Sequence, residues 1–534
     1  MRVERHGVVV VGAGVAGLAA AITAATVPGG PAGGTVTVLV DTTIGGGSSP
    51  WAQGGLAAAV DAADSPASHA ADTLAVSGGL GDRAAVDVLT GGAPDAVAWL
   101  RSLGTRFDVD ATGELALGRE AGHRARRIVH AHGDATGAEI MRALVEVARQ
   151  TPNLVLREHS VAVDLVRAGD RVVGVVALEG GRQVLHLAGA VLLASGGYGH
   201  LFARTTTPPV VRGGAVAMAC RAGAAVADLE MVQFHPTALA APGADPLPLL
   251  TEALRGEGAT LIDRDGRRFM VDEHPDAELA PRDVVARANY RVQQAGGAPA
   301  LDARSIGPDF PDRFPTVFAL ARAHGFDPRT DVLPVSPAAH YCMGGVATDV
   351  DGRSSLPGLW VIGEAASTGA HGANRLASNS VLEGVVMGRR VAPLLAGAVA
   401  PDVDGVEVPA GTLLVRGTNP GPVFGAVREV LWHHAGVVRD GASITAGLAA
   451  IDTLEAEGEP EDVPGRNALV VARAVLEAAA ARTESRGAHF RSDHPTADPA
   501  QASRRVVQPT AVATVTLGVG ATVAEVAAVS SVRS

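Results

Sequence analysis

The chain has 534 residues, a formal net charge of -12, and charged residues at 19% of its composition. With domains of about 100 to 200 residues, we expect about three domains rather than one core. The acidic balance argues against nucleic-acid binding, and the absence of charge blocks argues against extensive disorder. Cys220 and Cys342 are too few for a disulfide framework or an iron–sulfur cluster. We therefore expect a cytoplasmic protein without a metal site.

The first predicted elements are a strand, a glycine-rich turn and a helix, in "GVVVVGAGVAGLAAAITAA" (7 to 25). Gly12, Gly14 and Gly17 have the G-x-G-x-x-G spacing, which permits a tight turn, approach of a pyrophosphate to the backbone, and helix–strand packing. A second strand, "TVTVLVD", ends at Asp41, where a carboxylate would bind ribose hydroxyls. This pattern predicts a site for NAD or FAD rather than a signal peptide. No stretch reads as a membrane span.

A basic run follows in "GREAGHRARRIVHAHGDATG" (118 to 137), with the carboxylate of Glu120 near its start. The basic side chains are those of Arg119, His123, Arg124, Arg126, Arg127, His130 and His132. In an acidic chain, such a run suits a small dianion better than a polyanion. The alternatives are a solvated charge run and a Glu120 carboxylate paired with Arg119, Arg124 or another basic neighbour.

The segment after the run predicts a helix and then a small meander. "DATGAEIMRALVEVARQ" (134 to 150) is helical by period, and Asp134 is its expected cap. Residues 154 to 197 alternate as strands and return through a buried strand to Ser195, Gly196 and Gly197.

Two later stretches distinguish between NAD and FAD. "SSPWAQGGLAAAV" (48 to 60) and "GLWVIGEAASTGAHGANRLASNSVLEGVVMGRRVA" (358 to 392) resemble the flavin loops of the succinate dehydrogenase, fumarate reductase and L-aspartate oxidase flavoprotein family. The resemblance extends to about residue 495 and implies FAD as the cofactor. With the turn, it implies FAD contacts from Gly12, Ala13, Gly14, Val15, Ala16, Gly17, Asp41, Ser48, Ser49, Gln53, Gly54, Gly55, Ser195, Gly196, Gly197, Glu364, Asn379, Ser380 and Val381.

The helix predicted in "SNSVLEGVVMGRR" (378 to 390) would aim its N-terminus at the flavin and stabilise the negative charge of the reduced ring; the alternative is an ordinary N-cap. Two positions depart from the family. Membrane-associated relatives attach FAD to a histidine where this chain has Ser48, so we expect non-covalent FAD. Gly214 replaces an aspartate that contacts FAD in the family, so we expect weaker FAD binding.

The predicted fold is α/β: a Rossmann-like FAD-binding domain with an inserted α+β capping domain and a C-terminal helical bundle. We place the FAD-binding domain at 1–232 and 342–400, the capping domain at 233–341, and the helical domain at 418–495. Residues 400–417 are rich in Pro and Gly and are a predicted linker. The tail, 496–534, gives little indication of its structure.

Four short stretches resemble the substrate site of the family. They contain the predicted substrate and catalytic residues Gln233, His235, Arg282, His340, Tyr341, Arg375 and Ser378, and Thr251 is a further predicted substrate residue outside them. Arg375, His235 and His340 could hold both ends of a four-carbon dicarboxylate through charge-assisted bonds. The family uses the arginine at position 282 for proton transfer, although a guanidinium has a pKa above about 12. As alternatives, the histidines are structural and Arg282 pairs with Asp283.

Glu120 indicates which member of the family the chain resembles. Aspartate differs from succinate by an ammonium group, and its recognition needs a local negative charge. The loop around Glu120 resembles the L-aspartate oxidase version, whose glutamate faces the substrate amino group. That resemblance implies oxidation of L-aspartate to iminoaspartate with oxygen or fumarate as acceptor, and supply of the imine to quinolinate synthase at the start of NAD synthesis.

Two alternatives remain at this point. A soluble fumarate reductase or succinate dehydrogenase flavoprotein would need a partner protein that carries iron–sulfur clusters, or extra redox domains. A non-catalytic nucleotide-binding module, associated with RNA through the basic run, would be retained on heparin, whereas the acidic balance predicts no retention. We therefore expect neither nucleic-acid nor membrane partners.

Overall fold

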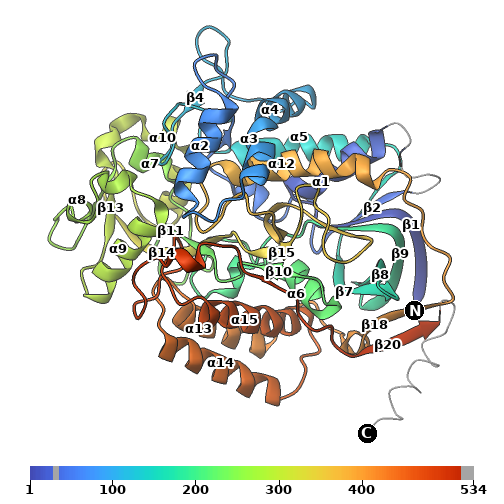
Figure 1. Ribbon diagram of the computed structural model, residues 1–534. Coiled ribbons are helices and arrows are strands. Elements are labelled where there is room, and N and C mark those ends of the chain that lie inside the picture. The colour runs from blue at the N-terminus through green and yellow to red at the C-terminus, as the bar shows by residue number, and fades with distance from the viewer. Residues whose placement is uncertain (28–29, 31–34, 519–534) are drawn as a thin grey trace.

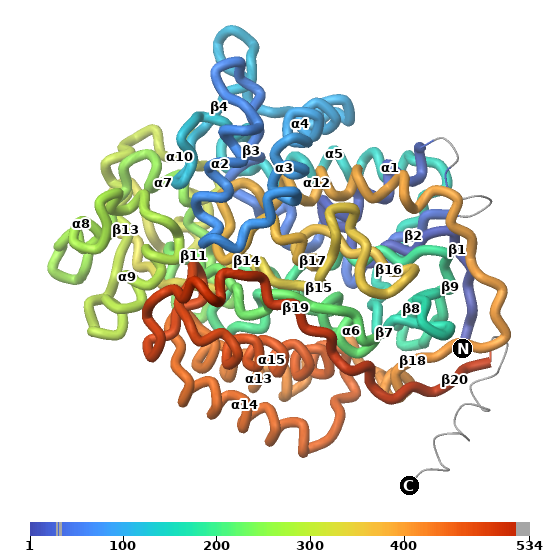
Figure 2. The backbone as a smooth tube through the Cα atoms, in the orientation of Figure 1, coloured from blue at the N-terminus to red at the C-terminus, as the bar shows by residue number. Residues whose placement is uncertain are grey.

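The computed structural model describes residues 1–27, 30 and 35–518, and a large mixed sheet lies at the right of the view (Figure 1, Figure 2). Within these residues the sheet has nine strands in the order β20-β18-β7-β8-β9-β1-β2-β6, with β16 also paired to β9. Their bounds are β1 Arg2–Val11, β2 Val36–Leu39, β6 Leu154–Arg157, β7 Ser160–Ala168, β8 Arg171–Glu179, β9 Arg182–Leu193, β16 Leu359–Val361, β18 Gly405–Pro409 and β20 Thr514–Gly518.

The parallel part of the sheet creates the ligand-binding edge. β1 runs parallel to β2 and β9, so Gly12, Asp41 and Ser195 follow strands that end at the same edge. Val8, Val9 and Val10 are fully buried because helices cover this part of the sheet, which explains their unbroken apolar run. Open α/β sheets bind ligands at the carboxyl ends of their strands.

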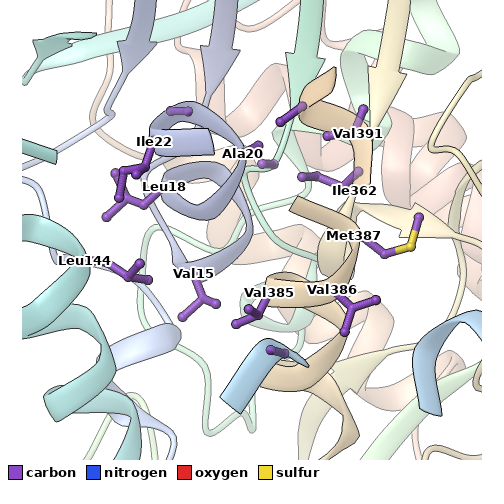
Figure 3. Close-up of a cluster of buried hydrophobic side chains, with 14 of the residues drawn as sticks. Val15, Leu18, Ala20, Ile22, Leu144, Ile362, Val385, Val386, Met387 and Val391 are labelled. Carbon is purple, nitrogen blue, oxygen red and sulfur yellow. The ribbon is translucent and has the colours of Figure 1, made fainter. Parts of the chain in front are cut away.

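Two helices pack together and direct their N-termini toward this edge. They are α1 (Val15–Thr26) and α12 (Asn379–Val391), and Figure 3 shows Val15 and Leu18 of α1 in one apolar cluster with Val385 of α12. A Cβ at Gly388 would lie 2.7 Å from the carbonyl oxygen of Ala16. The glycine therefore permits the close helix contact that brings two helix N-termini to one cavity.

The meander predicted after residue 154 is present as β7, β8 and β9, which pair antiparallel in sequence order. The predicted linker at 400–417 is wrong, because β18 lies within it and pairs with both β7 and β20. Val406 and Val408 alternate into an apolar cluster, and this inward burial outweighs the turn-forming Pro and Gly around them. β20 belongs to the tail, of which residues 519–534 lie outside the described part.

The inserted region has its own antiparallel sheet in the order β11-β14-β13-β12. Figure 1 shows it to one side of the main sheet, in green and yellow, with its helices around it. The strands are β11 Val232–Leu239, β12 Thr260–Ile262, β13 Ala300–Asp302 and β14 Leu333–Cys342; the helices are α7 Ala253–Gly256, α8 Met270–Glu273, α9 Arg282–Gln294, α10 Phe310–Arg313 and α11 Pro315–Ala323. β11 and β14 pair along the two chain crossings into this region, so they connect it firmly to the FAD-binding part.

Asp134 does not cap the helix that follows it. That helix, α5 (Thr136–Gln150), has no side-chain cap, whereas the Asp134 carboxylate accepts hydrogen bonds from the backbone N–H groups of Thr316 and Val317 at 2.8 and 2.9 Å. These N–H groups are unsatisfied donors in the first turn of α11. The predicted cap therefore serves a helix of the inserted region, distant in sequence.

Three helices near the C-terminus pack against one another at the bottom of the view in Figure 1: α13 Pro422–His434, α14 Gly441–Ala456 and α15 Val463–Ala481. The remaining α-helices are α2 Pro66–Val76, α3 Arg83–Gly91, α4 Ala93–Ser102 and α6 Gly214–Ala222. Short strands form two further sheets: β3 Leu56–Ala57, β4 Leu117–Gly118 and β5 Ile128–Val129, and then β10 Val226–Ala227, β15 Gly345–Ala347, β17 Ala366–Ser367 and β19 Val506–Val507. Among the described helices, none is long and apolar enough to cross a membrane. Cys220 and Cys342 are both buried and free.

Candidate active site

A cavity of about 670 Å³ lies between the carboxyl edge of the parallel strands, the N-terminus of α12 and the inserted region. Its volume is in the range typical of cofactor and substrate sites. Most of the predicted site residues line it. Gly17, Gly197, Gln233 and Asn379 are the predicted residues that are absent from its lining.

The glycine turn at the end of β1 accepts no side chains at its closest points. Gly12 has φ +108°, and a Cβ there would lie 2.4 Å from the carbonyl oxygen of Ala194. A Cβ at Gly17 would lie 2.0 Å from the carbonyl oxygen of Gly12. Gly17 therefore serves helix–strand packing, whereas Gly14, Val15 and neighbouring residues present the helix N-terminus to the cavity.

The cavity also contains buried polar atoms that lack a partner. They include the hydroxyls of Ser48 and Ser195 and the side-chain oxygen of Gln53. Buried polar atoms are nearly always hydrogen-bonded, so these atoms indicate a polar ligand. Together with two helix N-termini and the glycine turn, they fit an extended dinucleotide that carries a pyrophosphate and a polar ring, such as FAD.

Two acidic residues lie at opposite parts of the nucleotide region. Asp41 follows β2 and accepts a 2.6 Å hydrogen bond from Arg212, a cavity residue that the sequence analysis did not identify. Glu364 accepts from the backbone N–H of Cys342 at 3.0 Å, and burial raises the pKa of its carboxyl to about 7. A Cβ at Gly197 would lie 2.6 Å from Glu364, so Gly197 makes room for this carboxyl.

At the start of α12, Ser380 and Val381 line the cavity, but the Asn379 side chain lies elsewhere. Its amide oxygen lies 2.8 Å from Nε2 of His69, and its amide nitrogen donates to Thr73. Ser378 precedes α12 but its side chain does not cap the helix, because the hydroxyl donates to Glu120 at 2.6 Å and accepts from the N–H of Gly55 at 3.1 Å.

Two buried arginines reach the cavity from different regions. Arg282 begins α9, and Arg375 lies in the loop before α12. The side-chain oxygen of Gln233 accepts from both, at 3.0 and 3.1 Å, so Gln233 fixes the two guanidinium groups from behind. Arg375 also lies over the Tyr341 ring, 4.6 Å from its centroid. Two fixed guanidinium groups on one cavity wall suit a dicarboxylate.

His235 and His340 complete this wall, with ring centroids 5.0 Å apart. Burial and the nearby Arg282 hold the pKa of both rings well below the usual range. Both histidines are therefore neutral in the protein alone, so the positive charge on this wall belongs to the arginines. The histidines offer neutral N–H groups, and Thr251 is another lining residue with a hydroxyl.

The partner of Arg282 is Glu252, not the neighbouring Asp283. Glu252 is 3% exposed; its burial would raise its pKa, but Arg282 and Arg255 outweigh that effect and lower it. Sequence analysis missed Glu252. The available signal was "TEALR", in which Glu252 and Arg255 lie three residues apart and follow a predicted substrate residue.

Glu120 also lines the cavity, in an environment different from that of Glu252. It is 6% exposed, and within the described part of the chain no ion pair reaches it; its partner is the Ser378 hydroxyl. Burial, together with the negative charge of Glu252, raises the pKa of Glu120. The expected alternative, in which Glu120 pairs with Arg119 or Arg124, is therefore wrong.

The basic neighbours of Glu120 bind to other groups, and the run as a whole is not a dianion site. Arg127 pairs with Asp64 at 2.7 Å and Asp72 at 2.6 Å, and His130 pairs with Asp108 at 2.7 Å. The run stabilises the structure around Glu120 while leaving its carboxylate unpaired. A buried carboxylate without a cation is costly unless its ligand brings one.

Comparisons with known proteins agree with this site. Residues 7–381 match a family model described as an FAD binding domain, and residues 461–522 match one described as the fumarate reductase flavoprotein C-terminus. The L-aspartate oxidase of Caulobacter vibrioides is 48% identical across 93% of this chain and 95% of its own length. That of Streptomyces coelicolor is 45% identical across 94% and 90%.

Solved structures with lower sequence identity to this chain have a similar fold. A variant of FrdA from the E. coli quinol fumarate reductase superposes with a TM-score of 0.85 and 27% identity, covering 98% of both chains. Mycobacterium smegmatis Sdh1 has a TM-score of 0.81 and 29% identity, covering 97% of this chain and 94% of its own. FAD is therefore the cofactor of this fold, and the chain belongs to the L-aspartate oxidase family of FAD-binding flavoproteins.

Proposed function

We propose that this protein oxidises L-aspartate to iminoaspartate with non-covalently bound FAD. The observation that carries the proposal is Glu120, a buried carboxylate without a cationic partner in a cavity that also presents two arginines. The arginines supply charge for two carboxylates, and Glu120 supplies the opposite charge for an ammonium group. Aspartate carries all three groups.

The side chains of this chain bind and orient the substrate. Arg282 and Arg375 hold the carboxylates, and Gln233 prevents the two guanidinium groups from moving apart. The α C–H bond then breaks, a C=N bond forms and the nitrogen loses a proton. A bound FAD supplies the two-electron acceptor for this oxidation. Positioning by fixed groups accounts for much of the rate in such a site.

Arg282 and Glu252 offer a route for a proton between the cavity and the surrounding protein. Glu252 contacts Arg282 and lies 3.7 Å from Arg255, whose guanidinium donates to the carbonyl of Glu278. The reduction of fumarate forms C–H bonds rather than breaking them, and one carbon atom must gain a proton. We propose that Arg282 gives this proton and regains one along the Glu252–Arg255 route, and that Glu252 stabilises the restored guanidinium.

The similarity to fumarate reductases favours one further activity, the reduction of fumarate, because fumarate presents the same two carboxylates to the arginines. We propose fumarate and oxygen as electron acceptors, and supply of iminoaspartate to quinolinate synthase in NAD synthesis. Ser48, in place of a histidine, supports dissociable FAD. A fumarate reductase or succinate dehydrogenase without aspartate oxidation is the competing assignment.

Anaerobic bleaching of the flavin absorbance tests the proposal. FAD-loaded protein is mixed with L-aspartate or with succinate in separate cuvettes, and then exposed to air with an assay for hydrogen peroxide. We expect bleaching by L-aspartate, and peroxide on aeration. Bleaching by succinate alone would assign the protein to the dehydrogenases and contradict the role of Glu120.

A further inference from the structure

The segment 375–379, at the start of α12, joins both halves of the substrate site. Arg375 lies at its start, and Ser378, which holds Glu120 and the N–H of Gly55, lies near its end. Ser378 has φ +59°, a left-handed conformation that costs free energy for a residue with a side chain. Such a conformation persists only where the surrounding structure holds it.

Two buried imidazoles hold the residues on either side of Ser378. Nε2 of His123 lies 3.0 Å from the carbonyl oxygen of Ala377, and Nε2 of His69 lies 2.8 Å from the side-chain oxygen of Asn379. His123 belongs to the basic run that also carries Glu120, three residues earlier. The short segment 120–123 therefore contacts this region twice. Glu120 accepts from the Ser378 hydroxyl, and His123 contacts the backbone carbonyl of the preceding residue, Ala377.

The contacts of His123 fix its tautomer. Nη1 of Arg127 lies 3.3 Å from Nδ1 of His123, and a guanidinium can only donate, so Nδ1 is the acceptor and Nε2 carries the hydrogen that Ala377 accepts. Arg127 is itself fully buried and held by Asp64 and Asp72. Burial is the main cause that lowers the pKa of His123 to about 4, so the ring is neutral at physiological pH.

We infer that His123 is a positioning residue for recognition of the substrate amino group. It holds the Ala377 carbonyl, keeps Ser378 in its left-handed conformation, and thereby keeps the Ser378 hydroxyl on Glu120. This inference rests on the proposed function. It also gives the basic run a use that its charge alone does not explain, since Arg127 sets the hydrogen position of His123 and does not contact the cavity.

The test compares two substitutions of His123 in the FAD-loaded protein. His123→Leu removes the N–H donor at similar size, whereas His123→Gln retains an amide N–H. His130→Leu is the matched control, because His130 is in the same run but binds Asp108. For each protein, kcat and KM are measured for L-aspartate oxidation and for fumarate reduction by a reduced viologen dye, across a range of pH.

We expect His123→Leu to raise the KM for L-aspartate by about tenfold, as when a hydrogen bond that supports a charged group is lost, with a smaller change for fumarate. The acid limb of kcat/KM for L-aspartate should move to higher pH, because Glu120 loses the hydroxyl that lowers its pKa. His123→Gln should restore both values, and His130→Leu should change neither.

A double-mutant cycle with Ser378→Ala keeps the inference falsifiable if His123→Leu is poorly folded. If His123 acts through Ser378, the double variant with His123→Gln and Ser378→Ala should have the same pH profile as the Ser378→Ala variant alone. Adding His123→Leu to Ser378→Ala should likewise change the profile little. Equal losses for aspartate and fumarate, or additive losses in the cycle, would overturn the inference. A wild-type protein inert to L-aspartate would instead overturn the proposed function, and the inference with it.

Discussion

Two buried carboxylates face the same cavity, and their surroundings are opposite. Glu252, from the inserted region, contacts Arg282 and lies near Arg255, and its pKa is lowered. Glu120, from the FAD-binding part, has a serine hydroxyl as its partner, and its pKa is raised. The carboxylate of Glu252 is neutralised by the protein, whereas that of Glu120 awaits a cation from the ligand.

This difference separates two tasks within one site. The Glu252 side, with Arg282, Arg375 and Gln233, recognises what aspartate and fumarate share, which is a pair of carboxylates. The Glu120 side, with Ser378, recognises what aspartate alone has, which is the ammonium group. A change on the Glu252 side should therefore affect both substrates, and one on the Glu120 side should affect aspartate selectively.

The largest effect is expected from Arg282→Gln. The substitution removes a substrate anchor and the proposed proton donor, and it leaves Glu252 without its strongest partner. Loss of a general acid costs about 10² to 10⁴ in rate, so kcat for fumarate reduction should fall by that range. Aspartate oxidation should also fall, and the flavin absorbance of the purified protein verifies that FAD still binds. A loss of activity confined to L-aspartate would contradict the assignment of Arg282 to the recognition of both substrates.

Gln233→Leu should have a smaller effect of the same kind. Its amide oxygen accepts from both arginines, so the substitution leaves each guanidinium with one hydrogen bond fewer. We expect KM for L-aspartate and for fumarate to rise together by about tenfold, since hydrogen bonds to charged groups are worth about 1.5 to 3 kcal/mol. Steady-state assays with both substrates check this, and an effect on only one of them would contradict shared carboxylate recognition.

Ser378→Ala probes the Glu120 side through pH. The hydroxyl lowers the pKa of a carboxyl that burial already raises, so its removal should raise that pKa further. Glu120 must be ionised to bind an ammonium group, and kcat/KM for L-aspartate therefore falls as pH decreases through this pKa. The acid limb should move to higher pH in the variant. The profile for fumarate reduction serves as the internal control and should keep its position.

The smallest effect is expected at the cofactor. Gly214 is the first residue of α6, and the nearest atom to a Cβ there is the Asn467 amide nitrogen at 3.7 Å, so an aspartate has room. A carboxylate at a helix N-terminus stabilises the helix by about 0.3 to 1 kcal/mol. The family resemblance implies that the carboxylate at this position also contacts FAD. Gly214→Asp should lower the dissociation constant of FAD by a few-fold in a fluorescence titration. Selectivity between aspartate and fumarate should not change.

Local patterns in the sequence predicted the parts of the molecule that depend on neighbouring residues. The glycine turn is such a part, because backbone geometry at Gly12 and Gly17 forces its spacing. The meander and the helix after Ser378 also follow from periodicity. The resemblance to a family supplied the predicted substrate residues, which the structure gathers at one cavity or directly behind it, as for Gln233.

Contacts distant in sequence could not be predicted in this way. Asp134 caps a helix almost two hundred residues away. Arg282 pairs with Glu252 rather than with the adjacent Asp283, because the fold buries Arg282 and Glu252 together. The strand at 405–409 has the alternating residues Val406 and Val408, but β7, β20 and the apolar cluster that it joins come from distant parts of the chain. In each case a partner distant in sequence decides the structure.

The most direct test of the account is the selectivity of Glu120→Gln. The substitution keeps the size of the side chain and removes its charge, so only recognition of the ammonium group should suffer. The ratio of kcat/KM for L-aspartate oxidation to kcat/KM for fumarate reduction should fall by about 10- to 100-fold, the worth of a hydrogen bond to a charged group. An unchanged ratio would contradict the division of the site into a carboxylate side and an ammonium side.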